Sequence, residues 1–195
     1  MQTDVTRPSL QARCTPEETE LLHRHRAGDD AAFNALVRPH LAALWTLARR
    51  LTGDHQWAEG LTQETLVRAY RGIDGFRGDA SLRTWLLRIE IRLAGEPARW
   101  RRHDRAPTRS DIDVPDHLGP SPDEPALQRE LRDRLEEAME RLTPRQRTAL
   151  HLRATEGLDY QSIAVAMSCS AGAARMLVLA ARRHVQARMG RYLAP

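Results

Sequence analysis

The sequence contains no lysine, so all 30 of its basic side chains other than histidine are arginines. The formal net charge is nevertheless only +4. Guanidinium groups form paired hydrogen bonds with phosphates and base edges, which makes a nucleic acid a candidate partner. A GC-rich genome would produce the same bias toward arginine, so charge by itself does not decide the class of partner.

Cysteines are also scarce, because only Cys14 and Cys169 occur and neither belongs to a CxxC pair. This spacing argues against a disulfide framework and favours a reducing compartment. No window holds the roughly 18 uninterrupted apolar residues of a membrane span, and the first 14 residues lack the apolar stretch of a signal peptide. We therefore expect a cytoplasmic protein without membrane insertion.

Two further absences concern the fold and the chemistry. No Val/Ile/Thr-rich alternating run is flanked by turn residues, so we expect no strands. The eight histidines are scattered, and no HExxH, no Cys/His ligand spacing and no phosphate-binding glycine loop occurs. His23 and His25 lie two apart on an expected helix and face different sides. We expect no catalytic residue, metal site, cofactor or small-molecule substrate, and hence no enzyme.

The sequence is instead rich in helix signals. Thr15-Pro16-Glu17-Glu18 has an N-cap, a first-turn proline and a capping-box glutamate. Apolar residues recur at helical spacing over 33–51, where Pro39 is expected to kink the helix and Gly53-Asp54 to end it. A further helix is expected over 55–70. Another is expected to open at Asp79 or Ala80 and to stop at Gly95-Glu96-Pro97.

The composition changes sharply at residue 106, where proline, glycine and aspartate become frequent until residue 125. Such a stretch is typical of a linker. We expect an all-α protein of two small helical domains joined by this flexible linker. The segments are a disordered lead-in at 1–14, a first domain at 15–105, the linker at 106–125, and a second domain at 126–190.

The second domain has the pattern of a helix-turn-helix. Helices are expected from about Ala126 to 142 and, after a capping box that begins at Thr143, to about Glu156. A short helix capped by Asp159, a three-residue turn and a longer helix capped by Ser170 follow. This pattern alone is weak evidence of nucleic-acid binding, because short capped helix pairs are common.

The order of the segments is more specific. LTQETLVRAYRGIDGFRGDASLRTWLLRI at 61–89 and LTPRQRTALHLRATEGLDYQSIAVAM at 142–167 resemble the two signature segments of the extracytoplasmic-function (ECF) subfamily of bacterial sigma factors, within the sigma-70 family. The resemblance spans roughly residues 17–188. It implies that the first domain contacts the clamp of RNA polymerase and the minus-ten element, and that the second contacts the flap and the minus-thirty-five element. Core RNA polymerase, promoter DNA and an anti-sigma regulator are the partners to expect.

The resemblance also assigns residues in the first domain. Leu61, Gln63 and Glu64 would bind core polymerase from an exposed helix face. The loop that captures a flipped base, together with the helix after it, would contact the minus-ten region through Phe76, Arg77, Gly78, Asp79, Ser81 and Arg92. Extruding a base costs a few kcal/mol, and a glycine allows the close backbone approach that can offset this cost. Trp85 is expected in the core.

In the second domain the resemblance assigns the minus-thirty-five contacts to Ser170, Gly172, Arg175 and Arg182. The recognition helix departs from the family, however, because outward positions that are usually polar are largely apolar here. Only Arg175 remains near the N-terminal end to contact a base edge. Met176, Leu177 and Leu179 form a candidate surface for a protein partner, although methyl contacts with an unusual minus-thirty-five element are the alternative.

The first domain departs as well, since Glu90-Ile91-Arg92 and Gly95-Glu96-Pro97 replace the usual Ala-Arg-Asn run and Asp-His pair. Gly60 also stands where the family has an aspartate. Two functions therefore remain open. The first is a sigma factor that directs core polymerase to promoters, and the second is a sigma-derived interaction protein that binds polymerase or a regulator but reads promoter DNA poorly.

Overall fold

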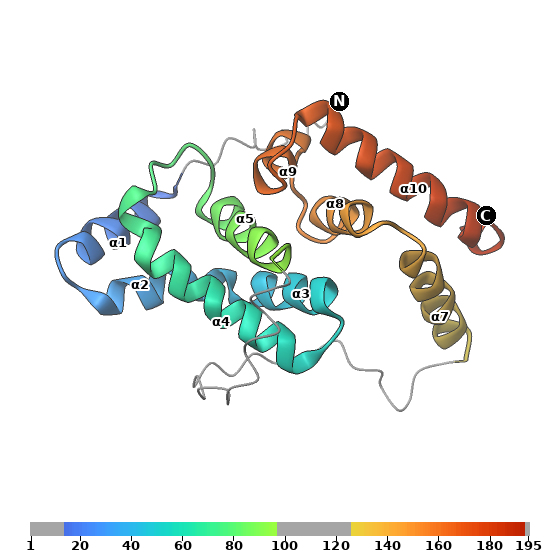
Figure 1. The fold of residues 1–195 in the computed structure, drawn as a ribbon, viewed down its shortest axis with the longest axis horizontal. Coiled ribbons are helices and arrows are strands. Elements are labelled where there is room, and N and C mark those ends of the chain that lie inside the picture. Colours follow the sequence, from blue (N-terminus) through green and yellow to red (C-terminus); the bar gives the residue numbers. More distant parts are fainter. Residues whose placement is uncertain (1–13, 97–125, 194–195) are drawn as a thin grey trace, which may run out of the picture.

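The structure is a computed structural model that describes residues 14–96 and 126–193 (Figure 1). Helices and their connecting turns account for these two ranges, and neither contains a strand. The expected all-α fold of two helical domains is confirmed. The lead-in at 1–13, the arginine-rich stretch from 99 to 105 and the linker at 106–125 lie outside the described residues.

The first domain begins with two short helices and ends with a helix that leads toward the linker. Pro39 lies in a single 3-10 turn, so the helix expected over 33–51 is divided in two rather than kinked. Proline has no N–H to donate, which interrupts the α-helical hydrogen bonds at this point. The elements are α1 (Pro16–Arg26), α2 (Asp30–Val37), η1 (Arg38–His40), α3 (Leu41–Thr52), α4 (His55–Gly72), η2 (Ile73–Gly75) and α5 (Leu82–Ala94).

Caps set the helix boundaries in this domain. Gly53 ends α3 with a φ of +72°, a left-handed conformation that favours glycine, and the side chain of Asp54 then accepts a hydrogen bond from the Trp57 N–H at 2.9 Å. The cap of α5 is Ser81 rather than Asp79 or Ala80, because its Oγ accepts from the Thr84 N–H at 3.2 Å. The loop before α5 is therefore longer than the sequence predicted.

The second domain consists of α7 (Ala126–Glu140), α8 (Pro144–Ala154), α9 (Tyr160–Ala166) and α10 (Ala171–Leu193). The expected caps are present, since Asp159 accepts from the Ser162 N–H at 2.7 Å and Ser170 Oγ accepts from the Ala173 N–H at 3.1 Å. The axes of α9 and α10 differ by 102°. This pair is the expected helix-turn-helix.

The two domains pack against each other, with α9 on α5 and α8 on α3 (Figure 1). One apolar cluster contains buried side chains of both domains, including Leu36, Leu86 and Leu87 of the first and Leu152 and Ile163 of the second. A smaller cluster holds α3, α4 and α5 together within the first domain. The sequence predicted two tethered domains, and it gave no sign of this shared core.

Candidate functional site

The three residues of α4 that were expected to bind polymerase differ in their exposure to solvent. Leu61 is fully buried, packed with Trp45 and Leu93, and so it does not lie on an exposed face. Its position follows from helical spacing, because Leu61 falls in the apolar stripe that α4 turns toward α3 and α5. Gln63 and Glu64 lie at the edge of this stripe and remain partly exposed.

Gln63 and Glu64 already have partners along α4. Gln63 donates to a carboxylate oxygen of Glu59 at 3.2 Å, and Glu64 accepts from the Arg68 guanidinium at 3.0 Å. Pairs of this kind, four residues apart on a helix surface, are weak and are easily replaced by a partner's charges. The acidic side of α4 is therefore available for docking.

Sequence reasoning missed two apolar side chains that extend this surface. Val67 and Tyr70 are 41% and 44% exposed and follow Glu64 at intervals of three residues, on neighbouring parts of the helix surface. The Tyr70 hydroxyl donates to Asp30 at 2.7 Å, which holds the ring in one orientation. Exposed aromatic and apolar side chains that lie together are typical of an interface, and their spacing on the helix was the signal that could have found them.

The expected base-capture loop, residues 76–81, has an anchored beginning and an open middle. The ring of Phe76 is buried and lies 5.2 Å from that of Trp85, so it faces the core rather than a base. Trp85 is only partly buried, but it packs against the core as expected. Arg77 and Asp79 are exposed on either side of Gly78, which has a φ of +73°. The polar groups of this loop are thus presented to solvent.

A residue far away in the sequence holds the start of this loop. The Arg26 guanidinium at the end of α1 donates to the backbone carbonyls of Asp74 and Phe76 at 3.3 and 3.0 Å. These carbonyls stand immediately before the exposed part of the loop. No local pattern could have indicated this contact, because it joins residues about fifty positions apart.

The arginines of α5 differ in their surroundings. Arg92 in the last turn is exposed, as a DNA contact requires, and α5 ends at Ala94 near the predicted Gly-Glu-Pro break. Arg83 in the first turn pairs instead with Glu156, which lies between α8 and α9 of the second domain. One end of α5 therefore faces the other domain while the other end faces solvent.

The residues expected to contact the minus-thirty-five element, Ser170, Gly172, Arg175 and Arg182, are all exposed on or beside α10. The Arg175 guanidinium lies over the Tyr160 ring, 5.7 Å from its centre, and Arg153 lies at 5.2 Å from the same ring. Cation–π contacts of this kind restrain a long side chain. Arg175 is thus oriented by the first residue of α9.

The apolar positions on α10 differ in their exposure. Met176 is 62% exposed, whereas Leu177 and Leu179 are half-buried. The opposite side of the helix is buried at Ala174 and Val178 and packs against the core. The candidate partner surface is therefore centred on Met176.

A buried polar cluster lies between the two domains. Glu156 forms an ion pair with Arg83, and His151 Nε2 lies 3.3 Å from its other carboxylate oxygen. The side chains of His151 and Glu156 are almost fully buried. Burial by itself would raise the pKa of Glu156, but His151 and Arg83 outweigh it and hold that pKa below its ordinary value. Glu156 is therefore ionised at neutral pH.

Glu90 on α5 is a second buried acid near this cluster. It is fully buried, and neither of its carboxylate oxygens has a hydrogen-bond partner in the part of the chain that the structure describes. Burial and the negative charge of Glu156 raise the pKa of Glu90 well above its ordinary value. The sequence showed only that Glu90 departs from the family pattern, and it did not indicate that this side chain is buried.

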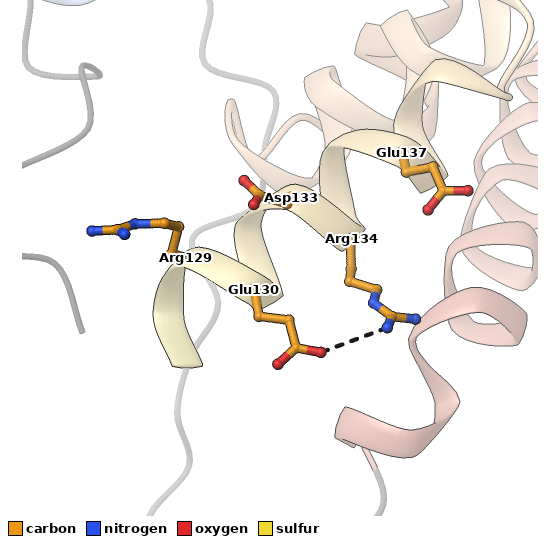
Figure 2. Close-up of a pocket in the computed structure, with 5 residues that line it drawn as sticks. All are labelled: Arg129, Glu130, Asp133, Arg134 and Glu137. Carbon is orange, nitrogen blue, oxygen red and sulfur yellow. Dashed lines mark ion pairs between the residues drawn. The ribbon is translucent and has the colours of Figure 1, made fainter. Parts of the chain in front are cut away.

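A shallow depression of about 340 Å³ runs along α7, lined by Arg129, Glu130, Asp133, Arg134 and Glu137 (Figure 2). Glu130 and Arg134 form an ion pair at 3.6 Å across one helical turn. This arrangement is a charged face of one helix.

No group of three or more metal-ligating side chains occurs within residues 14–96 and 126–193. In the same ranges no single helix is long and apolar enough to cross a membrane. The bent pair of α9 and α10 reaches that length and apolar composition only when the two helices are counted together.

Two family models match the chain: the model of sigma-70 region 2 matches residues 36–106, and the model of sigma-70 region 4 matches residues 132–185. The RNA polymerase sigma-H factor of Pseudomonas aeruginosa is 34% identical over 181 residues, which cover 87% of this chain and 92% of that protein. The ECF RNA polymerase sigma-E factor of Escherichia coli K12 is 32% identical, over 85% of this chain and 90% of that protein.

Solved structures show the same fold. The complex of CnrH with the cytosolic domain of CnrY has a TM-score of 0.64 at 22% identity and covers 89% of this chain and 97% of that one. The sigma factor RpoE of Bartonella quintana, in complex with the anti-sigma factor NepR, has a TM-score of 0.61 at 26% identity and covers 81% of this chain and 96% of that one.

Proposed function

This chain belongs to the ECF group of RNA polymerase sigma factors, and from this membership we propose that it directs core polymerase to promoters and helps to open them. The protein catalyses no reaction of its own, works in the cytoplasm and needs no cofactor. Its two domains are proposed to span residues 15–105 and 126–190. The observation that carries it is the presence of both sigma-70 regions, in order, in one chain.

Core polymerase is proposed to dock on α4 through Gln63 and Glu64, with Val67 and Tyr70 as apolar neighbours. Leu61 contributes indirectly, because its burial fixes the orientation of the helix. A basic surface on the polymerase would take the place of Arg68 beside Glu64.

Promoter contacts are proposed in both domains. In the minus-ten region, Arg77, Gly78, Asp79 and Ser81 surround the flipped base and Arg92 contacts a phosphate, while the buried Phe76 anchors the loop. In the minus-thirty-five region, Arg175 reads a base edge, and Ser170, Gly172 and Arg182 approach the DNA backbone.

The direct test is transcription in vitro with the purified full chain, core polymerase and fragments of the host genome. Initiation at defined sites is expected, and Glu64→Arg should lower the affinity for core polymerase. Glu20→Arg is the matched control, because Glu20 is an exposed acid on α1, outside the proposed surface. Binding to core polymerase without initiation at any site would contradict the proposal.

The exposed Met176 on the recognition helix favours a second candidate function, that of an interaction protein with poor promoter reading. An anti-sigma factor is the partner class to test first, since the Bartonella relative was solved with one. Under this alternative, Met176→Glu disrupts a protein complex and Arg175→Ala has no effect on DNA binding. Under the first proposal, Arg175→Ala weakens minus-thirty-five binding.

A further inference from the structure

Side chains of two other helices converge on the ring of Tyr160, the first residue of α9. The Arg153 guanidinium of α8 lies 5.2 Å from the centre of this ring, and the Arg175 guanidinium of α10 lies 5.7 Å from it. The three helices pack on one another in the second domain (Figure 1). The ring is therefore a common support for an arginine of α8 and for Arg175, the expected base contact.

The segment that leads into Tyr160 is held in place by hydrogen bonds. The Leu158 N–H donates to the carbonyl of Leu152 at 3.0 Å, and the Arg153 guanidinium donates to the carbonyl of Leu158 at 2.8 Å. Asp159 then caps the first turn of α9. Tyr160 itself is partly buried and packs against the apolar core. The position of the ring is thus set by α8, α9 and the turn between them, and it does not depend on Arg175.

Arg153 and Arg175 differ in what their guanidinium groups still offer. Arg153 already donates to a backbone carbonyl, whereas the structure gives the exposed Arg175 guanidinium no ion pair or hydrogen bond within residues 14–96 and 126–193. A cation–π contact uses the charge of a guanidinium and none of its N–H donors. Tyr160 therefore restrains Arg175 while its donors stay available for a paired contact with a base edge.

The second cation at the ring bears on the kind of base that Arg175 meets. Arg153 and Arg175 carry like charges and lie over the same ring, so an electron-rich acceptor beside Arg175 lowers their mutual repulsion. Guanine presents two acceptors in the major groove, at O6 and N7, whereas cytosine presents an amino donor there. The arrangement around Tyr160 therefore favours a guanine as the base that Arg175 reads.

We propose that Tyr160 is a positioning residue for recognition of the minus-thirty-five element, because its ring, shared with Arg153, holds Arg175 in the orientation that reads a guanine. This inference rests on the proposed function, in which Arg175 reads a base edge. A restrained side chain loses less conformational freedom on binding, and this gain is realised only where the base offers matching acceptors. Loss of the ring should lower discrimination at that base pair by about two- to fivefold, the equivalent of an exposed cation–π contact.

The contact can be tested first without DNA, by nuclear magnetic resonance of the full chain with isotope-labelled arginine. The ring current of Tyr160 should shift the δ-methylene protons of Arg175 upfield, since the guanidinium lies over the ring. Tyr160→Phe keeps the ring and should keep this shift, whereas Tyr160→Leu should abolish it. An ordinary chemical shift for Arg175 in the unsubstituted chain would overturn the contact.

The second test measures base discrimination by the holoenzyme, formed from the full chain and core polymerase. The probe is a promoter from the transcription assay, prepared as a duplex library that is randomised over the minus-thirty-five element. Sequencing of the bound DNA should show a weaker preference for guanine at one position in Tyr160→Leu and an unchanged preference in Tyr160→Phe. Gln161→Ala, at an exposed neighbouring position on α9, is the matched control and should leave all preferences unchanged.

A double-variant comparison shows whether Tyr160 acts through Arg175. In an R175A background, Tyr160→Leu should cause no further loss at that position, because the side chain that the ring positions is absent. A further loss there would overturn the positioning role, as would undiminished discrimination in Tyr160→Leu or an equal loss of affinity for every sequence. Circular dichroism checks that each variant keeps its helical content.

Failure of the proposed function has a different signature. A holoenzyme of the unsubstituted chain that prefers no sequence in the library would contradict the proposed function and, with it, the role of Tyr160 in reading DNA. The upfield shift of Arg175 would persist in that case. Its persistence distinguishes this outcome from loss of the contact between Arg175 and Tyr160.

Discussion

At the scale of single residues, the main departure from an ordinary helical core is the buried acid Glu90. Its carboxyl group makes no hydrogen bond among the described residues and lies near the negative charge of Glu156. A buried ionised carboxylate without a partner is costly, and a neutral one much less so. The raised pKa of Glu90 is therefore the way in which the fold tolerates this residue, because the folded state favours the neutral acid.

This raised pKa makes stability depend on pH in a defined direction. Below about pH 4.5, folded and unfolded chains both hold the Glu90 proton. Above about pH 4.5, Glu90 loses its proton in the unfolded chain but keeps it in the folded chain. Rising pH therefore lowers the free energy of unfolding until the pH passes the pKa of Glu90 in the folded chain. Glu90→Gln should remove this slope and raise the free energy of unfolding at pH 8 by at least about 1 kcal/mol.

Denaturant titrations from pH 5 to pH 8 measure this effect. The lowered pKa of Glu156 acts at the acid end, where stability is lost as pH falls through its folded-state pKa, and so the chosen range separates the two acids. Glu136→Gln, at an exposed position on α7, is the control. A parallel pH dependence in Glu90→Gln and the unsubstituted chain would show that Glu90 is not the cause.

Arg26 is the second residue whose role depends on a distant contact. Arg26→Ala frees the carbonyls of Asp74 and Phe76, so amide hydrogen exchange in the loop at 76–81 should rise about fivefold, the equivalent of about one hydrogen bond. Promoter melting should fall while binding to core polymerase is unchanged. Arg26→Lys should recover part of the protection, and Arg24→Ala, two residues away and paired with Asp29, should leave the loop unaffected.

At the scale of elements, the recognition helix α10 combines a regular fold with an unusual surface. Its buried stripe is that of any helix-turn-helix, but Arg175 and Met176 stand next to each other at its exposed N-terminal end. An arginine that is bidentate to guanine contributes about 1 to 3 kcal/mol of base discrimination. The proposed function therefore assigns the reading of the minus-thirty-five element to the single side chain of Arg175, and one substitution can test this assignment.

Arg175→Ala should reduce discrimination at one base pair of the minus-thirty-five element by about 5- to 150-fold, since Arg175 is the expected base contact. Arg182→Ala should instead weaken binding to all sequences and lower the slope of log affinity against log salt by about one, since Arg182 is an expected phosphate contact. Binding titrations with single-base variants, at several salt concentrations, distinguish the two. Equal effects of both substitutions on every sequence would contradict the base-reading role of Arg175.

The helices were predictable from the sequence because their signals are local. Both capping boxes, at Thr15 and Thr143, form as expected, and Gly53 and Asp159 mark boundaries where predicted. The prediction of helix boundaries was less accurate where several neighbouring residues could act as the N-cap. Ser81 caps α5 instead of its neighbours, because its side chain reaches the Thr84 N–H while the preceding residues form the loop.

The candidate site was less predictable, since family resemblance gives positions but not exposure. Leu61 and Phe76 occupy positions assigned to partners, and both side chains are buried. Helical periodicity indicates that one face of α4 is apolar, but which residues lie at its edge depends on how α3 and α5 pack on it. Exposure of Gln63 and Glu64 was therefore a result of tertiary structure.

At the scale of the whole molecule, the association of the domains could not be predicted from the sequence. Arg83 and Glu156 are separated by 73 positions, and each belongs to a segment whose local pattern is complete without the other. A proline-rich linker indicates independent domains, which is the usual outcome. The shared apolar core and the buried pair are instead properties of the assembled surfaces, which no periodicity reveals.

This shared core leads to a prediction about cooperativity. Because apolar side chains of both domains form one cluster, unfolding of either domain exposes apolar surface on the other. The full chain should therefore unfold in a single transition, with coincident curves from circular dichroism and from a fluorophore in either domain. Arg83→Glu should split this into two transitions, as expected for uncoupled domains, whereas Arg24→Glu should keep one. Two transitions in the unsubstituted chain would mean that the contact of α5 with α9 is too weak to couple the domains.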